Sequence, residues 1–222
     1  MLLGLHMATI IPYRDEDGAA VSAAVAPVVK AGGLVAIPTE TYYGLGADPF
    51  NQAAVERLIA VKGRPDGKPI LVLIGALRQL DALVTHVPPP ARVLMDTYWP
   101  GPLTIVLPAN PRLPVALTAG TGTLGVRLTS CGPLAALLKI VGPLTGTSAN
   151  RSGALPESTA AGVQSALGDT LDMIIDAGPT PGEAPSTVVR IVGGRSVELV
   201  REGVLTRDQL EKILAPHAIP LT

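Results

Sequence analysis

The stretch GGLVAIPTETYYGLG, residues 32–46, contains the pattern that decides the fold. Two glycines end a helical segment, a short apolar run follows at 34–37, and a loop of Pro, Thr, Glu and Tyr begins at 38. Glycine is favoured directly after a helix, and a short β-rich run bounded by Gly or Pro is typical of a buried strand. The stretch therefore predicts a helix–strand unit whose strand ends in a polar loop.

The same alternation continues in both directions along the chain. Residues 19–31 have a helical pattern that Pro27 is expected to kink or shorten, and Asn51 is a suitable N-cap for a helix through residue 61. Thr206 and Gln209 predict a capping box at the start of a terminal helix. The other predicted helices are 77–83, 90–98, 133–140 and one capped by Ser158 that runs through 167. The other predicted strands are 70–74, 103–107, 124–128, 144–147, 173–176, 187–192 and 197–201.

Strands interleaved with helices, followed by adjacent strands late in the chain, indicate an α/β fold with a mixed, twisted sheet and helices packed around it. No internal repeat, low-complexity linker or shift of composition divides the sequence, so residues 1–222 are expected to form one domain. Hydrophobic residues make up 47%, which is in the range of globular proteins.

The charge balance argues against a protein that grips nucleic acid mainly through phosphates. The chain has 17 Lys and Arg against 18 Asp and Glu, whereas such binders are usually basic. Cys131 is the only cysteine, which excludes a disulfide framework and a multi-Cys metal site and favours a reducing compartment. A basic leader and an apolar run long enough to cross a bilayer are both missing. The expected location is the cytoplasm, with no membrane partner.

Familiar catalytic signatures fail at identifiable positions. Residues 63–69, GRPDGKP, have the wrong glycine spacing for a Walker loop and a proline where the Mg²⁺-binding hydroxyl belongs. Residues 120–125 match G-x-G-x-x-G, but a predicted strand follows them instead of a helix. GTSAN at 146–150 ends in Asn where a nucleophile elbow has Gly. The histidines lie in separate terminal or loop-like segments, so a His metal site or a Ser–His pair has little support.

Polar loops follow apolar strands at several places. They lie at residues 38–46, 62–68, 121–127, 147–150, 185–187 and 201–203. Strand-end loops are where α/β folds place ligand contacts. Together these loops supply cations, hydroxyls and amides, but few acids or bases. This inventory favours an anionic ligand held by charge and hydrogen bonds, with chemistry driven by positioning.

Each residue in these loops also has an ordinary structural interpretation. Lys62 and Arg64, taken alone, fit solvated charges at a helix C-terminus, where the helix dipole stabilises them. Ser148 and Asn150 are common turn formers. Arg127 lies in an apolar stretch and fits a strand arginine that faces solvent. Taken singly, the residues leave both interpretations open, and their combination and order carry the argument.

The order of the motifs resembles the YrdC-type family of L-threonylcarbamoyladenylate synthases. The matching motifs are PTETYYGLG at 38–46, KGRP at 62–65, WPGPLT at 99–104, GVR at 125–127, TSAN at 147–150 and PSTVV at 185–189. The resemblance implies the short, single-domain form of the family and a YrdC-like fold that encloses a large, positively lined cavity. Some relatives carry His where this chain has Leu73, so no threonine contact is expected there.

The resemblance implies a nucleotidyltransferase that converts L-threonine, bicarbonate or CO₂, and ATP into threonylcarbamoyl-AMP and pyrophosphate. A downstream tRNA threonylcarbamoyl-transferase complex would then modify an adenosine in tRNAs that read ANN codons. Mg²⁺ is expected to be held mainly by ATP rather than by protein ligands. Any direct binding of RNA is expected to be weak.

The resemblance also assigns roles to residues, and their chemistry is consistent with these roles. The planar guanidinium fork and the lysine ammonium group both suit a triphosphate. Catalytic roles are implied for Lys62 and Arg64. ATP binding is implied for Arg64, Lys68, Thr123, Asn150, Ser158 and Arg201, and L-threonine binding for Thr41, Arg127, Ser148, Ser186 and Thr187.

Two other functions are compatible with the same fold. A module that binds double-stranded RNA or ribosomes without catalysis would bind RNA strongly without turning over ATP, and it would not need all of the loop motifs. A carbamoyl-adenylate enzyme of the hydrogenase-maturation type shares this domain, but it normally carries acylphosphatase and zinc-finger segments. The single cysteine and the length of the chain weigh against that second alternative.

Overall fold

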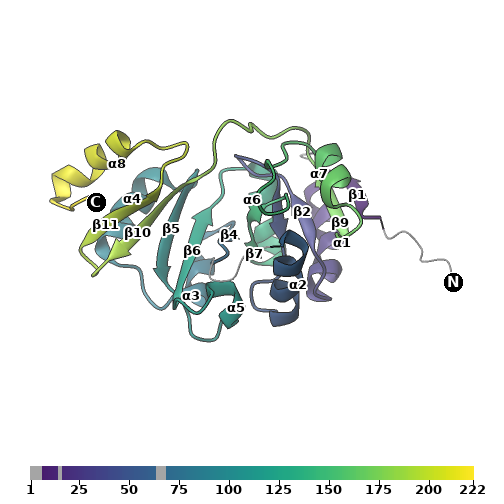
Figure 1. Ribbon diagram of the computed structural model, residues 1–222, viewed down its shortest axis with the longest axis horizontal. Helices are drawn as coiled ribbons and strands as arrows, with labels where there is room; N and C mark the ends of the chain where they lie inside the picture. Colours follow the sequence, from purple (N-terminus) through teal and green to yellow (C-terminus); the bar gives the residue numbers. More distant parts are fainter. Residues whose placement is uncertain (1–6, 15–16, 64–68) are drawn as a thin grey trace.

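The computed structural model describes residues 7–14, 17–63 and 69–222. Its strands form two sheets, which lie side by side in Figure 1 with helices around them. Both sheets mix parallel and antiparallel pairs, which confirms the predicted α/β class with mixed pairing. The sequence indicated one sheet, and the division into two is a feature that strand patterns alone did not predict.

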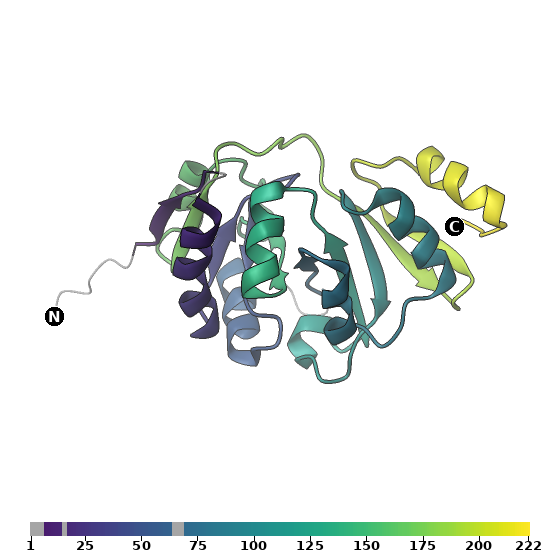
Figure 2. The ribbon, with the colours of Figure 1, turned by 180° about the vertical axis from the view of Figure 1, so that it is seen from behind.

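One sheet has five strands in the order β1-β9-β2-β3-β8. These strands are β1 (Thr9–Pro12), β9 (Met173–Asp176), β2 (Val35–Ile37), β3 (Gly44–Gly46) and β8 (Thr147–Ser148). Helices α1 (Gly18–Lys30) and α6 (Gly132–Val141) contact each other and cover one face, as Figure 2 shows. Val21, Val25 and Val29 of α1 recur on one helix face and join the buried cluster that includes Leu134 and Leu138 of α6.

The other sheet has six strands in the order β11-β10-β5-β6-β4-β7. These strands are β11 (Ser196–Arg201), β10 (Thr187–Val192), β5 (Leu103–Pro108), β6 (Thr123–Leu128), β4 (Val72–Ile74) and β7 (Leu144–Thr145). The remaining helices are α2 (Gln52–Lys62), η2 (Leu77–Gln79), α3 (Leu80–Leu83), α4 (Pro89–Tyr98), α5 (Val115–Thr118), α7 (Ala160–Leu167), α8 (Arg207–Leu214) and η3 (Ala215–His217). Among the described residues, no helix is both long and apolar enough to span a bilayer.

The chain passes between the two sheets at Gly146. Sequence analysis predicted a single strand at 144–147, but β7 belongs to the six-stranded sheet and β8 to the five-stranded one. A side chain at Gly146 would lie 2.4 Å from Cγ of Leu73, so only glycine allows the backbone to pass this close to β4. The crossing brings the loop after β8 next to the face of the other sheet.

The helix caps mostly follow the sequence. The Asn51 side chain accepts a hydrogen bond from the Ala54 amide, and Thr206 forms the expected capping box with Gln209. The prediction for α7 was wrong by one residue, because Thr159 and not Ser158 is the N-cap. Thr159 has an extended backbone and its hydroxyl accepts from the Gly162 amide at 3.1 Å, which satisfies one of the free amides at the helix start. Strands β1 and β3 and helix α5 were not predicted.

Tyr43 links the start of β3 to the loop after β9 and gives a testable pH dependence. Its hydroxyl donates to the Gly178 carbonyl at 2.8 Å, and burial, followed by the charge of Asp176, raises its pKa from 10.0 to about 12. The folded protein therefore favours the neutral phenol. This contribution is fully present below pH 10 and is lost as the pH rises towards 12. We expect the loss to reach about 1.4 kcal/mol by pH 11.

The measurement is urea unfolding of the wild type and Tyr43→Phe at pH 8 and pH 11. The unfolding free energy of the wild type minus that of Tyr43→Phe should be lower by this amount at pH 11 than at pH 8, because phenylalanine does not titrate. Equal differences at both pH values would contradict the account of Tyr43.

Candidate functional site

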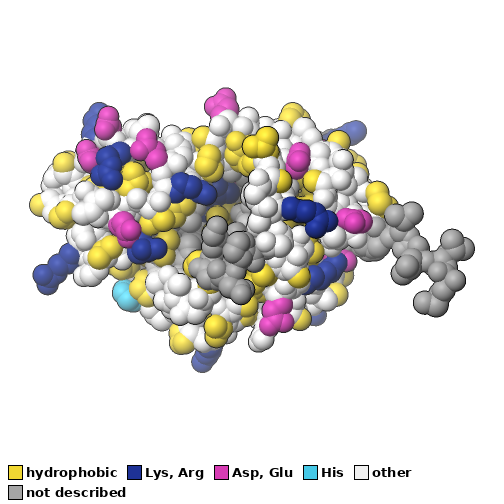
Figure 3. Space-filling view, viewed as in Figure 1, with side chains coloured by type: hydrophobic (Ala, Val, Ile, Leu, Met, Phe, Trp, Pro, Cys, Tyr) yellow, Lys and Arg dark blue, Asp and Glu magenta, His cyan; other side chains and the backbone are white. Residues whose placement is uncertain are grey.

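A cavity of about 850 Å³ lies between the two sheets. Figure 3 shows its mouth near the middle of one face, with Lys and Arg side chains at the border. The six-stranded sheet contributes Thr104, Val106, Thr123, Gly125, Arg127, Val188, Arg190, Val200 and Arg201 to its lining. The loops and strands of the other sheet contribute Thr39, Thr41, Tyr42, Tyr43, Gly44, Thr147 and Ser148. The lining also includes Pro69, Ile70, Leu71, Thr121, Gly146, Pro156, Pro185 and Ser186.

Strand alternation explains why the six-stranded sheet supplies so many of these residues. Side chains two apart share a face of a sheet, and the lining takes alternate residues from β5, β6 and β10. Strand β11 breaks this rule, because Val200 and Arg201 are consecutive and both line the cavity. The register between β10 and β11 shifts after Val188, and a β-bulge of this kind lets both side chains reach the same side.

Arg127 is the most buried cation of the cavity lining, with an exposed fraction of 3%. Its Nε lies 3.3 Å from Glu40 Oε1, and its Nη1 lies 3.5 Å from the Thr41 hydroxyl. Burial lowers the pKa of Arg127, and the charge of Glu40 opposes this effect. A guanidinium remains protonated in proteins, so the cavity contains a poorly solvated positive charge.

Arg201 supplies a second cation to the cavity lining. It is the last residue of β11, the edge strand of the same six-stranded sheet. Its Nη2 donates to the Ser186 carbonyl at 2.8 Å and to the Ser186 hydroxyl at 3.3 Å. Partial burial at the cavity wall, and then the positive charge of Arg127, lower the pKa of Arg201, although part of this residue is exposed. The two cations therefore disfavour each other, and an anion bound between them would relieve this repulsion.

Lys62 is buried behind the Ser148–Asn150 loop, with an exposed fraction of 3%. Its ammonium group donates to the Ser148 carbonyl at 2.5 Å and to the Asn150 carbonyl at 2.9 Å, with the Asn150 side-chain oxygen at 3.4 Å. An ammonium group has three donors, and these contacts tie it to the backbone of that loop. This burial excludes the interpretation of Lys62 as a solvated helix-end charge, and its functional role stays a prediction.

Two other predicted residues, Asn150 and Thr187, also use their side chains to hydrogen-bond loop backbone. The Asn150 amide donates to the carbonyls of Arg151 and Ala154. The Thr187 hydroxyl donates to the Leu205 carbonyl and accepts from two amides of the same loop. Asn150, Thr187 and Ser158 are not part of the cavity lining.

The structure brings half of the predicted site residues to one cavity. These are Thr41, Thr123, Arg127, Ser148, Ser186 and Arg201. Arg64 and Lys68 lie outside the described residues. Sequence reasoning missed Glu40, which stands inside the PTETYYGLG motif, and Arg190, which lies two positions past Val188 on the same strand face. A period-two extension of the PSTVV motif would have found Arg190.

The chemistry of the lining does not suit a protein-held metal ion. Its polar side chains are arginines, tyrosines and hydroxyls, and the described lining has no carboxylate or imidazole. Mg²⁺ prefers carboxylate and phosphate oxygens with several waters. The part of the chain that the structure describes also has no group of three His, Cys, Asp or Glu side chains that could hold a metal.

The fold and the site define an α/β protein in which two mixed sheets border a cavity lined by arginine, tyrosine and hydroxyl side chains. A family model named Sua5/YciO/YrdC, with the description "Telomere recombination", matches residues 27–203. The chain belongs to this family, as its motifs indicated.

Named relatives agree with this membership. The threonylcarbamoyl-AMP synthase of Thiobacillus denitrificans is 41% identical over 168 residues, which cover 75% of this chain and 89% of that protein. The threonylcarbamoyl-AMP synthase of Bacillus subtilis is 37% identical over 87% of this chain, which corresponds to 56% of the longer relative. The crystal structure of Pyrococcus abyssi Sua5 complexed with L-threonine has a TM-score of 0.87 at 33% identity, and it covers 97% of this chain and 62% of its own.

Proposed function

We propose that this protein is an L-threonylcarbamoyladenylate synthase, which forms threonylcarbamoyl-AMP and pyrophosphate from L-threonine, bicarbonate or CO₂, and ATP. The observation that carries the proposal is the convergence of motifs distant in sequence on one cavity that contains Arg127 and Arg201. The names of the relatives support an enzyme over a non-catalytic RNA-binding module. The structure of Pyrococcus abyssi Sua5 complexed with L-threonine supports an amino acid as one ligand.

The reaction needs positioning more than acid–base catalysis. The amine of threonine attacks CO₂ to form a carbamate, and a carbamate oxygen then attacks the α-phosphorus while pyrophosphate leaves. Negative charge is present on the carbamate, the phosphates and the leaving group throughout. Fixed cations in a partly dry cavity stabilise such charge strongly, because little solvent reorganisation is needed.

We assign the two substrates to different parts of the cavity. Thr41, Arg127, Ser148 and Ser186 would hold L-threonine, and Arg201 and Thr123 would hold the nucleotide. Arg64 and Lys68 would contact the triphosphate, with Arg64 acting on the reacting phosphate. Mg²⁺ would arrive with ATP, because the described lining offers it no carboxylate.

The remaining described residues of the predicted site support the cavity loops in this proposal and do not contact the substrates directly. Lys62 is a positioning residue, because its donors hold the loop that carries Ser148. Asn150 and Thr187 shape the loops that border the two substrate positions. Ser158 would reach the nucleotide only if its loop moved towards the cavity. The product would pass to a tRNA threonylcarbamoyl-transferase complex, with weak direct contact to RNA.

The proposal predicts pyrophosphate release that requires ATP, L-threonine and bicarbonate together. Omitting either L-threonine or bicarbonate should reduce the rate to background, because no carbamate forms to attack ATP. The measurement is a coupled pyrophosphate assay with Mg²⁺, together with mass-spectrometric detection of the threonylcarbamoyl adenylate. Strong RNA binding with no pyrophosphate release from folded protein would favour the RNA-binding alternative.

A further inference from the structure

Two buried polar atoms beside the cavity lack a hydrogen-bond partner. Among the described residues, the buried side-chain atoms without one are Glu40 Oε1, Arg127 Nε and Gln164 Oε1. The first two face each other at 3.3 Å, too poorly aligned for a hydrogen bond. Unsatisfied buried groups are rare in native proteins and call for an explanation. Here both atoms belong to one ion pair at the edge of the candidate site.

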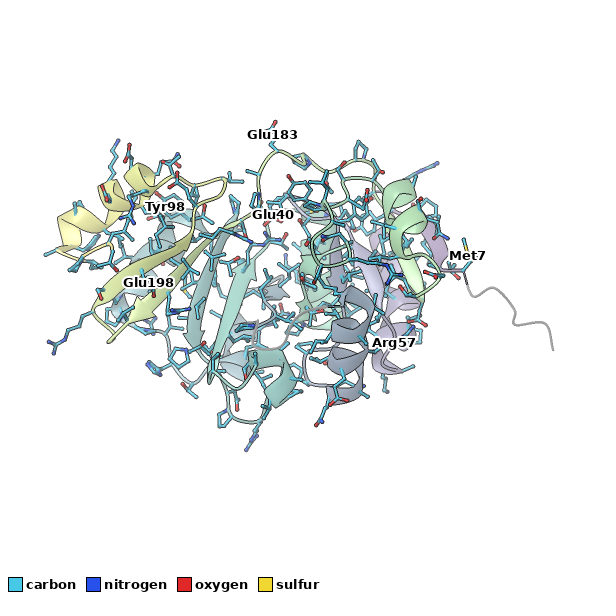
Figure 4. All side chains as sticks on the ribbon, viewed as in Figure 1. Met7, Glu40, Arg57, Tyr98, Glu183 and Glu198 are labelled. Carbon is cyan, nitrogen blue, oxygen red and sulfur yellow. The ribbon has the colours of Figure 1, made fainter. Side chains whose placement is uncertain are left out.

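The Glu40 side chain is held by residues of the six-stranded sheet, although its backbone belongs to the five-stranded side of the molecule. It follows β2 in the five-stranded sheet, whereas Thr129 and Arg127 belong to β6 and its extension in the six-stranded sheet. The Thr129 hydroxyl donates to Glu40 Oε2 at 2.6 Å and accepts from the Cys131 amide at 3.1 Å. Figure 4 shows Glu40 near the centre of the molecule, between the two sheets. One carboxylate oxygen is therefore anchored, and the other is aimed at Arg127.

The contact uses only one nitrogen of the guanidinium. A structural Arg–carboxylate pair commonly uses two parallel hydrogen bonds, which would consume a whole edge of the fork. Here Glu40 faces Nε, and Nη1 has only a 3.5 Å contact with the Thr41 hydroxyl. The edge formed by Nη1 and Nη2 thus retains capacity for a ligand, and Arg127 lines the cavity.

We propose that Glu40 is a positioning residue for amino-acid recognition: it fixes Arg127 so that the Nη1–Nη2 edge receives the carboxylate of the substrate end-on. This inference rests on the proposed function for the identity of the amino acid. Glu40 also offsets the charge of Arg127, so the empty site contains less repulsion while Arg201 stays available for the nucleotide. It touches neither substrate, and its effect passes through Arg127.

The test is Glu40→Gln, which keeps the shape of the side chain and removes its charge. We expect the KM for L-threonine to rise about tenfold, because misaligning a fixed substrate contact is costly, while the KM for ATP stays within about twofold. Thr129→Val, which removes the anchor of Oε2, should change the same parameter in the same direction by about threefold. A general structural defect would instead affect both substrates.

Glu211→Gln is the matched control. Glu211 pairs with Arg207 at 3.5 Å on α8, both side chains are more than a third exposed, and neither lines the cavity. Its KM for L-threonine should match that of the wild type. Calorimetric titration of L-threonine alone onto each folded variant gives a readout that does not require turnover. Thermal denaturation of each variant shows that it is folded.

The outcomes separate the inference from the proposed function. An active wild type with unchanged L-threonine affinity in Glu40→Gln and Thr129→Val overturns the inference and leaves the function standing. An inactive wild type that still binds L-threonine, with weaker binding in both variants, overturns the function and supports the role of Glu40. A wild type that binds no L-threonine overturns the inference as well. Equal increases in the KM for ATP and for L-threonine would also overturn it.

Discussion

Arg127→Lys should lower kcat/KM for L-threonine about 100-fold while the protein stays folded. Lysine keeps a positive charge opposite Glu40 but loses the planar fork that can bind a carboxylate with two hydrogen bonds. Hydrogen bonds to charged groups are each worth about 1.5–3 kcal/mol, and the loss of roughly 3 kcal/mol corresponds to this change in rate. The measurement is the initial rate of pyrophosphate release at varied L-threonine.

Arg57→Lys is the matched control for this prediction. Arg57 also pairs with a carboxylate, Asp172 at 2.7 Å, but it lies on α2 and is not part of the cavity lining. We expect kcat/KM within about twofold of the wild type, since surface substitutions outside special features have small effects. A drop in Arg127→Lys that merely equals that of Arg57→Lys would show that the buried guanidinium does not bind substrate.

Lys62→Met should both destabilise the protein and remove most of its activity. Methionine has a similar length, but it leaves the carbonyls of Ser148 and Asn150 buried without their charged donor. Each unsatisfied buried group costs about 1–3 kcal/mol, so the free energy of unfolding should fall by about 3 kcal/mol. The loop that carries Ser148 loses its support, and we expect kcat/KM to fall more than about tenfold at a temperature where the variant is folded.

Lys30→Met separates this effect from that of an ordinary helix-end lysine. Lys30 is the last residue of α1 as Lys62 is the last residue of α2, and Lys30 is exposed. Its interaction with the helix dipole is worth only about 0.3–1 kcal/mol. Urea unfolding and pyrophosphate release of the two variants should therefore differ clearly. Equal stability losses would mean that the contacts of Lys62 with the loop contribute nothing.

Local sequence signals predicted the elements of the fold well, because these signals act over a few residues. The cap at Asn51 and the capping box at Thr206 follow from hydrogen bonds between near neighbours in the chain. Strand β3 was missed for the opposite reason. The Gly44–Gly46 segment has little strand propensity of its own, and it is a strand because β2 and β8 pair with it on either side.

Half of the predicted site residues line the cavity, but their arrangement could not be predicted from the sequence. The resemblance implied roles for Arg127 and Arg201, whose electrostatic interaction became visible only when β6 and β11 were placed in one sheet. Glu40 stands in the first motif that the sequence presents, yet its partner on β6 is 87 positions away in the chain. Burial of a polar residue depends on such distant neighbours, and a pattern of adjacent residues does not report it.

The sequence by itself determined most of the helices and strands, which loops are polar, and the family to which the chain belongs. Only the tertiary structure decided that Lys62 is buried under a loop, that Gly146 carries the chain from one sheet to the other, and that Glu40 reaches across to Arg127. The physical reason is that caps, turns and periodic faces are properties of short segments. The environment of a charged side chain depends on all the residues packed around it, and many of these are distant in sequence and become neighbours only in the folded chain.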